Sequence, residues 1–319
     1  MSNRKNDWNH KNIWNHGYVT TPQAHLYYEI SGHGTPILFL HGNSQSHHIF
    51  HSYARKLQGS YQVILMDSRG HGRSRLFVRT ALRGFSTEDM ADDVAALLRH
   101  LHLSSVHLLG FSAGANIGLE IACKYPSLLR SLICLSANAS PDGLLTPLYL
   151  GARVQHAFLD GLSRFLFPLT RPFFLKRHSS RRIPALYAAA RSSRHLLARA
   201  HRPHPVLPPL LHRILRRRNL TSLLLHSPHL SARKLQDIST PVLLIAGTRD
   251  LIKTSHSRWL SRQIPGSQLL LITGGHHTTF FRTPEPYLNA ILRFLRQHSE
   301  TGFQAQAETS SQPHSHFAE

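Results

Sequence analysis

The sequence contains few cysteines, few acidic residues and no long apolar run. Cys123 and Cys134 are its only cysteines, which excludes a disulfide framework and predicts buried, reduced thiols. No stretch approaches the ~18 uninterrupted apolar residues of a membrane-spanning helix, and the polar residues 1–30 contain no apolar signal-peptide core. These absences favour a globular protein of the cytoplasm.

The shortage of acidic residues gives the chain a strong positive charge. It has 37 Lys and Arg residues against 16 Asp and Glu, a net charge of +21. Most of this excess lies in residues 141–235, where 17 basic residues face only Asp142 and Asp160. The basic residues alternate with Leu, Phe and Pro and accompany no nucleic-acid-binding motif, so no specific nucleic acid is expected. Three roles stay open for these basic residues: they bind an anionic substrate, they make weak contact with an anionic membrane surface, or they form a solvated face without a specific partner.

Short apolar strands alternate with helical stretches along most of the chain. Such continuous apolar runs are typical of strands buried on both faces, which predicts an α/β fold with a mostly parallel sheet flanked by helices. The alternation stops near Asn138 and resumes near Pro241. We therefore expect a core made of residues 18–140 and 236–298, a basic helical cap inserted at 141–235, and a disordered arm and tail at 1–17 and 299–319.

Residues 106–116 place a serine at a sharp turn between a strand and a helix. The Gly-Phe-Ser-Ala-Gly pentapeptide at 110–114 interrupts an apolar run, and its glycines remove side chains that would collide where strand and helix cross. The hydroxyl of Ser112 is then exposed at the apex, beside the positive end of a helix dipole. A Gly-x-Ser-x-Gly match alone is a weak signal, so its setting decides the interpretation.

Two later strand ends carry the groups that a serine nucleophile needs. Asp250 follows the strand at 241–247, and His276 and His277 follow the strand at 268–272. A histidine takes the proton of the serine, while a carboxylate fixes the histidine tautomer and stabilises the imidazolium. The chain order serine, acid, histidine is the one expected for a serine on such a turn. Both histidines qualify as the base at this point.

Backbone N–H groups of Ala113 and Asn43 are candidates for an oxyanion hole. Ala113 follows the nucleophile, and Asn43 follows a His-Gly pair at the end of the strand at 37–40. No metal or organic cofactor is expected, because the histidines lack the tight His-Glu-x-x-His spacing. The glycine-rich segment 67–74 lacks the Gly-Lys-Ser ending of a phosphate loop.

With these motifs, the sequence resembles the α/β-hydrolase fold superfamily over about residues 20–298, in the group of small esterase-like and haloperoxidase-like serine hydrolases. The matching segments are His41-Gly42-Asn43, Asp67-x-Arg69-Gly70-His71-Gly72-x-Ser74, Gly110-Phe111-Ser112-Ala113-Gly114, Gly247-x-x-Asp250 and Gly274-Gly275-x-His277. The resemblance implies an α/β-hydrolase fold and a Ser112–His277–Asp250 triad. It favours His277 over His276, because the histidine of this motif usually stands seven residues before a proline, here Pro284.

The resemblance and the residues together predict a serine hydrolase of small carboxylic esters or related acyl compounds, acting through an acyl-enzyme. Serine at position 112 argues against epoxide hydrolases and haloalkane dehalogenases, which resemble this pattern but carry aspartate there. A C–C bond hydrolase or an acyltransferase would use the same triad. A non-catalytic binding protein on the same fold is the alternative from another class. The physiological substrate, its acyl chain length, the oligomeric state and the role of the cap stay open.

Overall fold

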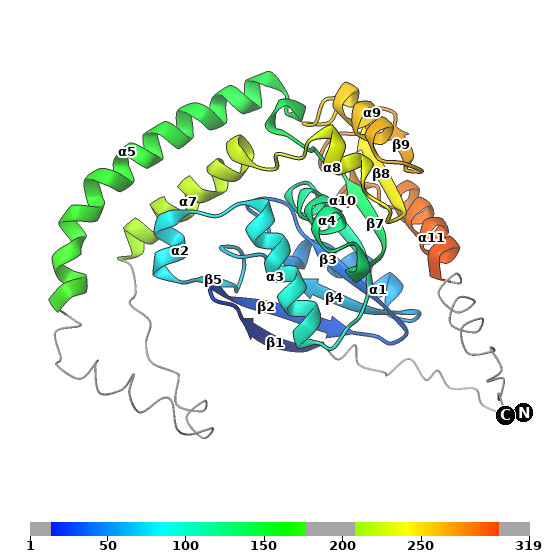
Figure 1. Ribbon diagram of the computed structural model, residues 1–319, viewed down its shortest axis with the longest axis horizontal. Coiled ribbons are helices and arrows are strands. Elements are labelled where there is room, and N and C mark those ends of the chain that lie inside the picture. The colour runs from blue at the N-terminus through cyan, green and yellow to red at the C-terminus, as the bar shows by residue number, and fades with distance from the viewer. Residues whose placement is uncertain (1–13, 177–207, 300–319) are drawn as a thin grey trace, which may run out of the picture.

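The structure is a computed structural model that describes residues 14–176 and 208–299. Nine strands of these residues form one sheet in the order β1-β2-β4-β3-β6-β7-β8-β9, with β5 paired to β2 (Figure 1). The strands are β1 (Asn15–Thr20), β2 (Ala24–Ser31), β3 (Thr35–Leu40), β4 (Tyr61–Met66), β5 (Arg75–Leu76), β6 (Val106–Phe111), β7 (Leu129–Leu135), β8 (Val242–Gly247) and β9 (Gln268–Ile272).

The sheet is parallel from β4 to β9 and antiparallel only where β1, β2 and β5 pair. The predicted mostly parallel sheet is therefore confirmed. Its central strands β3, β6, β7 and β8 are buried almost throughout, as their uninterrupted apolar sequences require. Parallel strands place their carboxyl ends at one edge, so the segments after β3, β6, β8 and β9 emerge on the same side.

Alternate residues of each strand enter two separate apolar layers. In β3, Leu38 and Leu40 pack on one face of the sheet, whereas Ile37 and Phe39 pack on the other. Each such fully buried side chain contributes roughly 1.5–3 kcal/mol to stability. The first layer is completed by α3 (Thr87–His100), α4 (Ala113–Lys124), α8 (Ala232–Gln236) and α9 (Thr254–Gln263). The second is completed by α1 (His51–Leu57), α10 (Thr279–Arg282) and α11 (Glu285–Ser299).

Short helical segments complete the core. They are η1 (His47–Phe50), α2 (Val78–Arg83), η2 (Pro126–Leu128) and η3 (Pro141–Gly143). The start of α3 has a capping box: the Ser86 hydroxyl accepts the backbone N–H of Asp89, and the Asp89 carboxylate accepts that of Ser86. This arrangement fixes the beginning of the helix that packs beside α4.

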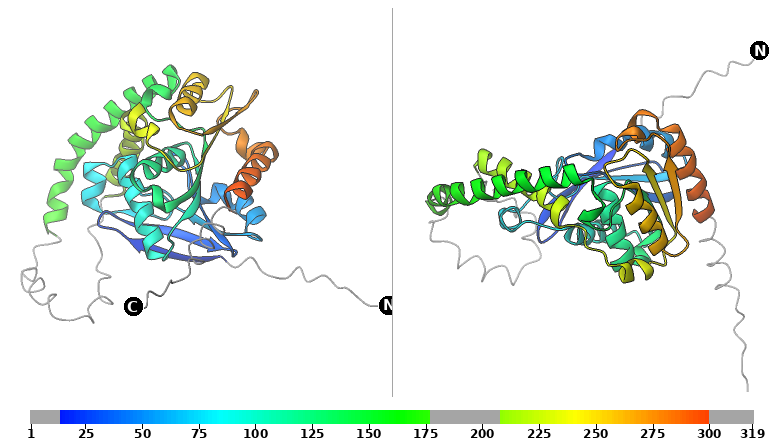
Figure 2. Two further views of the ribbon diagram at one scale, coloured as in Figure 1. Left: turned by 45° about the vertical axis from the view of Figure 1, so that its right-hand side comes forward. Right: turned by 90° about the horizontal axis from the view of Figure 1, so that it is seen from above.

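The regular elements that the structure describes between β7 and β8 are all helices. After η3, α5 (Thr146–Lys176) and α7 (Pro209–His226) pack along each other and arch beside the core (Figures 1 and 2). The α7 helix is fastened to α2, because Asn219 Nδ2 donates to Ala81 O at 2.9 Å and Arg218 Nη2 donates to Leu82 O at 2.7 Å. The middle of the predicted cap, 177–207, lies outside the described residues.

The boundaries predicted for the two terminal segments were wrong by a few residues. The arm predicted for 1–17 overlaps β1, whose residues Asn15–Thr20 pair with β2. Only Val19 of this edge strand is buried, so its sequence is polar and gives no strand signal. The tail predicted for 299–319 overlaps α11, which ends at Ser299. Residues 1–13 and 300–319 lie outside the described residues.

Both cysteines have the environments expected of reduced thiols. Cys134 is fully buried in β7, and Cys123 is half-buried in α4; neither forms a disulfide. Burial raises the pKa of the Cys123 thiol to about 11, so this group is a poor nucleophile at neutral pH. Among the helices that the structure describes, none combines the length and apolar character needed to cross a membrane.

Candidate active site

Ser112 lies on a strained turn between β6 and α4. Its backbone has φ 52° and ψ −118°, a conformation that costs a residue with a side chain roughly 1–3 kcal/mol. The Ser112 N–H donates to Leu135 O at 2.8 Å, and the Ser112 carbonyl accepts the first helical bond from Asn116 at 3.0 Å. The turn is thus held by β7 on one side and by α4 on the other.

The two glycines of the turn are required by close backbone approach. A Cβ on Gly110 would lie 2.3 Å from the carbonyl oxygen of Gly114. A Cβ on Gly114 would lie 2.0 Å from the carbonyl oxygen of Leu40, at the end of β3. Any side chain at either position would push α4 away from the sheet and move the Ser112 hydroxyl.

His277 lies between Ser112 and Asp250. Its Nε2 is 3.1 Å from Ser112 Oγ, and its Nδ1 is 2.5 Å from Asp250 Oδ1. A carboxylate only accepts hydrogen bonds, so His277 Nδ1 carries the proton and donates it, and Nε2 is free to accept from the Ser112 hydroxyl. The imidazole also packs on Phe111, with ring centroids 4.9 Å apart. This is the arrangement in which a histidine takes a proton from a serine.

The loops after β8 and β9 are joined, which brings Asp250 and His277 together. Thr248 N donates to Ile272 O at 3.0 Å, and Arg249 N donates to Gly275 O at 2.9 Å. A Cβ on Gly247 would lie 2.0 Å from Gly275 O, so this close approach requires a glycine. The Gly-x-x-Asp and Gly-Gly-x-His spacings of the sequence thus follow from one packing contact.

His276, the alternative base, points to a different environment. Its side chain is exposed, and its backbone N–H donates to Thr279 Oγ1 at 2.8 Å. That bond begins the turn that leads into α10. The structure brings His277 rather than His276 to Ser112.

Asp250 is held by a residue that the sequence motifs do not contain. Its carboxylate is buried and accepts the Ser136 hydroxyl on Oδ2 at 2.5 Å and the Ile252 N–H on Oδ1 at 3.3 Å. Burial raises the pKa of Asp250, but the bonds and charge of His277, with the Ser136 bond, outweigh it and hold the pKa below its ordinary value. Ser136 follows the last residue of β7, so its place at a strand end was the available signal.

The loop after β3 lies against the turn that carries Ser112. A Cβ on Gly42 would be 3.0 Å from the Phe111 ring, so the loop passes directly over that side chain. Ala113 is the first residue of α4, whose leading N–H groups lack helical partners. Within the residues described, no acceptor is found for the N–H of Ala113 or of Asn43. Both donors are therefore available to a ligand.

Buried polar contacts of His41 hold the loop after β3 in place. His41 Nδ1 donates to Gly42 O at 2.8 Å, and His41 Nε2 accepts the Ser68 N–H at 3.1 Å. Burial lowers the pKa of His41, which keeps the ring uncharged. Nearby, Arg69 forms an ion pair with Asp93, with Nε and Oδ2 2.6 Å apart. Segment 67–74 thus connects the loop after β3 with α3 through buried polar contacts.

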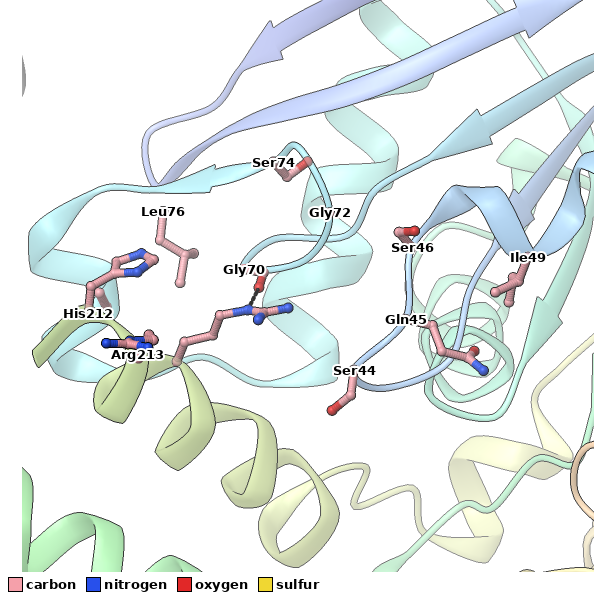
Figure 3. Close-up of a pocket in the computed structure, with 12 residues that line it drawn as sticks. Ser44, Gln45, Ser46, Ile49, Gly70, Gly72, Ser74, Leu76, His212 and Arg213 are labelled. Atoms are coloured by element: carbon pink, nitrogen blue, oxygen red, sulfur yellow. Dashed lines mark hydrogen bonds between the residues drawn. The ribbon is translucent and has the colours of Figure 1, made fainter. Parts of the chain in front are cut away.

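A cavity of about 520 Å³ lies beside the site, between the loops after β3 and β4 and helix α7 (Figure 3). Its wall includes Ser44, the residue after Asn43, and the basic side chains of His212, Arg213 and Arg216. Ser112 and His277 are not part of its wall, so the cavity flanks these residues and does not enclose them. The Asn43 side chain joins the loop after β3 to α7, because its Nδ2 donates to Leu220 O at 2.8 Å.

Arg216 also forms part of the wall of this cavity. Its Nε donates to Gly70 O at 2.8 Å, the bond drawn dashed in Figure 3. Because a guanidinium carries five N–H donors, this bond leaves other donors of Arg216 available to a ligand. His212 and Arg213 are exposed on the preceding turn of α7.

Comparisons with known proteins agree with this geometry. A model of the alpha/beta hydrolase fold family matches residues 35–284. The protein named "Putative carbamate hydrolase RutD" from Azorhizobium caulinodans is 29% identical over 278 residues, covering 87% of this chain and 97% of that protein. The solved structure of a thermophilic esterase from Thermogutta terrifontis has a TM-score of 0.60 with this chain and 23% identity, covering 91% of this chain and 99% of its own.

A further solved structure, Est816, is described as an N-acyl homoserine lactone degrading enzyme. It has a TM-score of 0.62 and 22% identity, and covers 87% of this chain and 100% of its own. Identities this low show a common fold and no more. A strand-to-helix turn bearing a serine, on a mostly parallel sheet, defines the α/β class of hydrolases. The chain belongs to the α/β-hydrolase fold family, and it is a hydrolase.

Proposed function

We propose that the protein is a serine hydrolase that cleaves carboxylic esters or related acyl compounds through an acyl-enzyme. The observation that carries the proposal is the continuous chain of contacts from Ser112 through His277 to Asp250. A protein that only binds a ligand has no need for these three groups in this order. The strained Ser112 backbone supports the same assignment, because such strain concentrates at reactive groups.

In the proposed reaction, Ser112 Oγ attacks the acyl carbon while its proton passes to His277 Nε2. The negative charge that develops on the acyl oxygen is stabilised by the N–H groups of Asn43 and Ala113, each contributing roughly 10²–10³ in rate. His277 then protonates the leaving group, which departs and leaves the acyl group on Ser112. Water attacks this ester while His277 Nε2 takes its proton, and His277 returns that proton to Ser112 Oγ as the bond to the acyl carbon breaks and the acid is released. Asp250 keeps the imidazole oriented and stabilises its charged form.

The hydrolysis of a p-nitrophenyl ester tests this proposal. Ser112→Ala is expected to lower kcat/KM by about a thousandfold or more. Ser60→Ala, a substitution of an exposed serine, is the matched control and is expected to keep the wild-type rate. An unchanged rate in Ser112→Ala would refute the assignment.

A panel of substrates and acceptors distinguishes ester hydrolysis from the other reactions that use the same triad. Relatives of this chain are named for carbamate, ester and lactone chemistry, so one substrate of each class forms the first panel. Adding an alcohol acceptor detects acyl transfer by the appearance of a new ester. A β-diketone substrate detects cleavage of a C–C bond. Hydrolysis of the ester panel without either product supports the proposed hydrolase.

We propose that the basic residues of the cap bind anionic substrates and that contact with an anionic membrane is not their role. The basic groups of Arg213 and Arg216 line a cavity next to the Asn43 loop, and a small ligand can reach them there. A guanidinium recognises a carboxylate through paired N–H donors. We expect a p-nitrophenyl hemisuccinate to be preferred over p-nitrophenyl butyrate, and Arg213→Ala to reduce that preference about tenfold, or about 1.4 kcal/mol. Equal loss for both esters would contradict this role.

A further inference from the structure

Three histidines and a glutamate lie close together near the loop that carries Asn43. His47 and His48 belong to η1, His51 begins α1, and Glu29 comes from the neighbouring strand β2. One nitrogen from each of the three imidazoles lies within 4.8 Å of the others. None of these residues belongs to the proposed triad or oxyanion hole. The cluster therefore needs an explanation of its own.

Asp67 determines which nitrogen of His47 carries the proton. Asp67 Oδ1 is 2.8 Å from His47 Nδ1 and also accepts the His47 backbone N–H at 2.8 Å. Asp67 Oδ2 also accepts the Arg73 backbone N–H at 2.7 Å. Both oxygens of Asp67 therefore accept, so His47 Nδ1 donates. Nε2 is then the nitrogen of His47 that is left to bind a ligand or a second proton.

This nitrogen faces a carboxylate. His47 Nε2 lies 3.1 Å from Glu29 Oε1, and His51 Nε2 lies 3.0 Å from Glu29 Oε2. Glu29 Oε1 also accepts the Tyr27 hydroxyl at 2.7 Å. Imidazole nitrogens and carboxylate oxygens this close share a cation, either a proton or a metal ion.

We propose that His47, His48, His51 and Glu29 form a binding site for a divalent transition-metal ion of the Zn²⁺ type. Three imidazoles and one carboxylate are a donor set that Zn²⁺ accepts in tetrahedral sites, and His-x-x-x-His is among its ligand spacings. Bonds of ~2.0–2.1 Å to a tetrahedral zinc place ligand atoms about 3.3 Å apart, close to the two separations across Glu29. The three imidazole nitrogens lie within 4.8 Å of one another, so they would move closer together as the ion binds.

The surroundings of the cluster suit a metal ion. The Asp67 carboxylate bonded to His47 Nδ1 is the partner that metal-binding histidines usually have, because it fixes the ring and makes Nε2 more basic. His48 is exposed, and the His51 side chain is 29% exposed, so an ion can enter from solvent. The Arg73 guanidinium, with Nη1 3.8 Å from Glu29 Oε1, is half-exposed and is held by the Tyr27 hydroxyl.

The metal would act as a structural cross-link. It would join β2 to the η1–α1 segment, which begins four residues after Asn43. A bond between these elements would hold the loop that supplies the Asn43 N–H. The role is stabilisation of the fold, distinct from the hydrolytic chemistry at Ser112.

Calorimetric titration of Zn²⁺ into the chelator-treated, untagged protein tests the site. The wild type is expected to bind one ion per chain tightly, and His51→Ala and Glu29→Gln are each expected to weaken this binding tenfold or more. If circular dichroism shows that these two variants fold poorly, His48→Ala takes their place in the test, because His48 is exposed and its loss does not disturb the core. His33→Ala, which removes an exposed histidine elsewhere, is the matched control and should bind as the wild type does.

Cobalt provides an independent readout. Co²⁺ in a site of three nitrogens and one oxygen gives intense visible absorption when four-coordinate, and His48→Ala and His51→Ala should abolish it. The chain has 26 histidines, so weak binding elsewhere is expected and is measured in the His48→Ala/His51→Ala double variant. Tight binding that survives in this double variant would overturn the proposal. So would a wild-type affinity no greater than that of the double variant, which would mean that a proton alone bridges His47 and Glu29.

Discussion

Ser136→Ala tests whether the environment of Asp250 positions the proposed base. The variant removes the hydroxyl that donates to Asp250 Oδ2 at 2.5 Å inside the protein. A hydrogen bond to a charged group contributes about 1.5–3 kcal/mol, and here the carboxylate Oδ2 keeps only a long contact of 3.5 Å with Gly247 N. The structure therefore predicts a loss of unfolding free energy of this size at neutral pH.

The same substitution should change the pH dependence of stability. The folded-state pKa of Asp250 lies below its unfolded value of about 3.9, so the carboxylate contributes stability above that pH and loses it as the pH falls through the folded pKa. Without Ser136 the folded pKa moves up towards the unfolded value. The stability difference between wild type and variant should therefore shrink as the pH is lowered, and urea denaturation between pH 7 and pH 3 measures it.

Kinetics separate positioning from general stability. If Ser136 fixes Asp250, and Asp250 fixes His277, kcat for a p-nitrophenyl ester should fall about tenfold while KM stays constant. Ser163→Ala is the control, because it removes another buried hydroxyl, which donates to the Asp160 carbonyl in α5 at 2.8 Å. That variant should lose about 1 kcal/mol of stability with no change in kcat. Equal kcat values in Ser136→Ala and wild type would refute the positioning role.

Three further substitutions test other parts of the account. Asn43→Ala keeps the backbone N–H but removes the bond to Leu220 O, so kcat should change less than about threefold, and a larger fall would show that the side chain itself takes part. Gly114→Ala places a Cβ 2.0 Å from Leu40 O and should abolish ester hydrolysis and lower Tm, whereas Gly161→Ala in α5, where a Cβ meets nothing, should raise stability by about 0.5–1 kcal/mol. Arg69→Met leaves Asp93 buried without its partner and should cost about 3–5 kcal/mol in urea denaturation; a loss below 1 kcal/mol would contradict the buried ion pair.

Much of the fold could be predicted from local sequence patterns. Buried parallel strands such as β3 and β8 have continuous apolar sequences, because both of their faces are covered. The edge strand β1 could not be recognised, because its stability comes from pairing with β2 and only Val19 is buried. The ends of elements depend on such tertiary partners, so the arm and tail boundaries were misplaced.

The candidate site was predictable where a chemical role constrains the spacing of residues. Ser112, Asp250 and His277 follow the ends of β6, β8 and β9, and in a parallel sheet the carboxyl ends of the strands lie at the same edge. Ser136 also follows a strand end, but serine is common in turns and its spacing to Asp250 carries no motif. The Glu29 contact with His47 and His51 joins residues from two elements whose pairing is set by the whole sheet. Sequence spacing alone cannot supply such a contact.

The most direct test of the central claim is the covalent labelling of Ser112. A fluorophosphonate reacts with an activated serine hydroxyl, and peptide mass spectrometry identifies the residue that carries the adduct. The account predicts one adduct per chain, on Ser112, formed rapidly in the wild type, at least a hundredfold more slowly in His277→Ala, and not at all in Ser112→Ala. An unlabelled wild-type protein, or labelling of Ser112 at the same rate in His277→Ala, would contradict it.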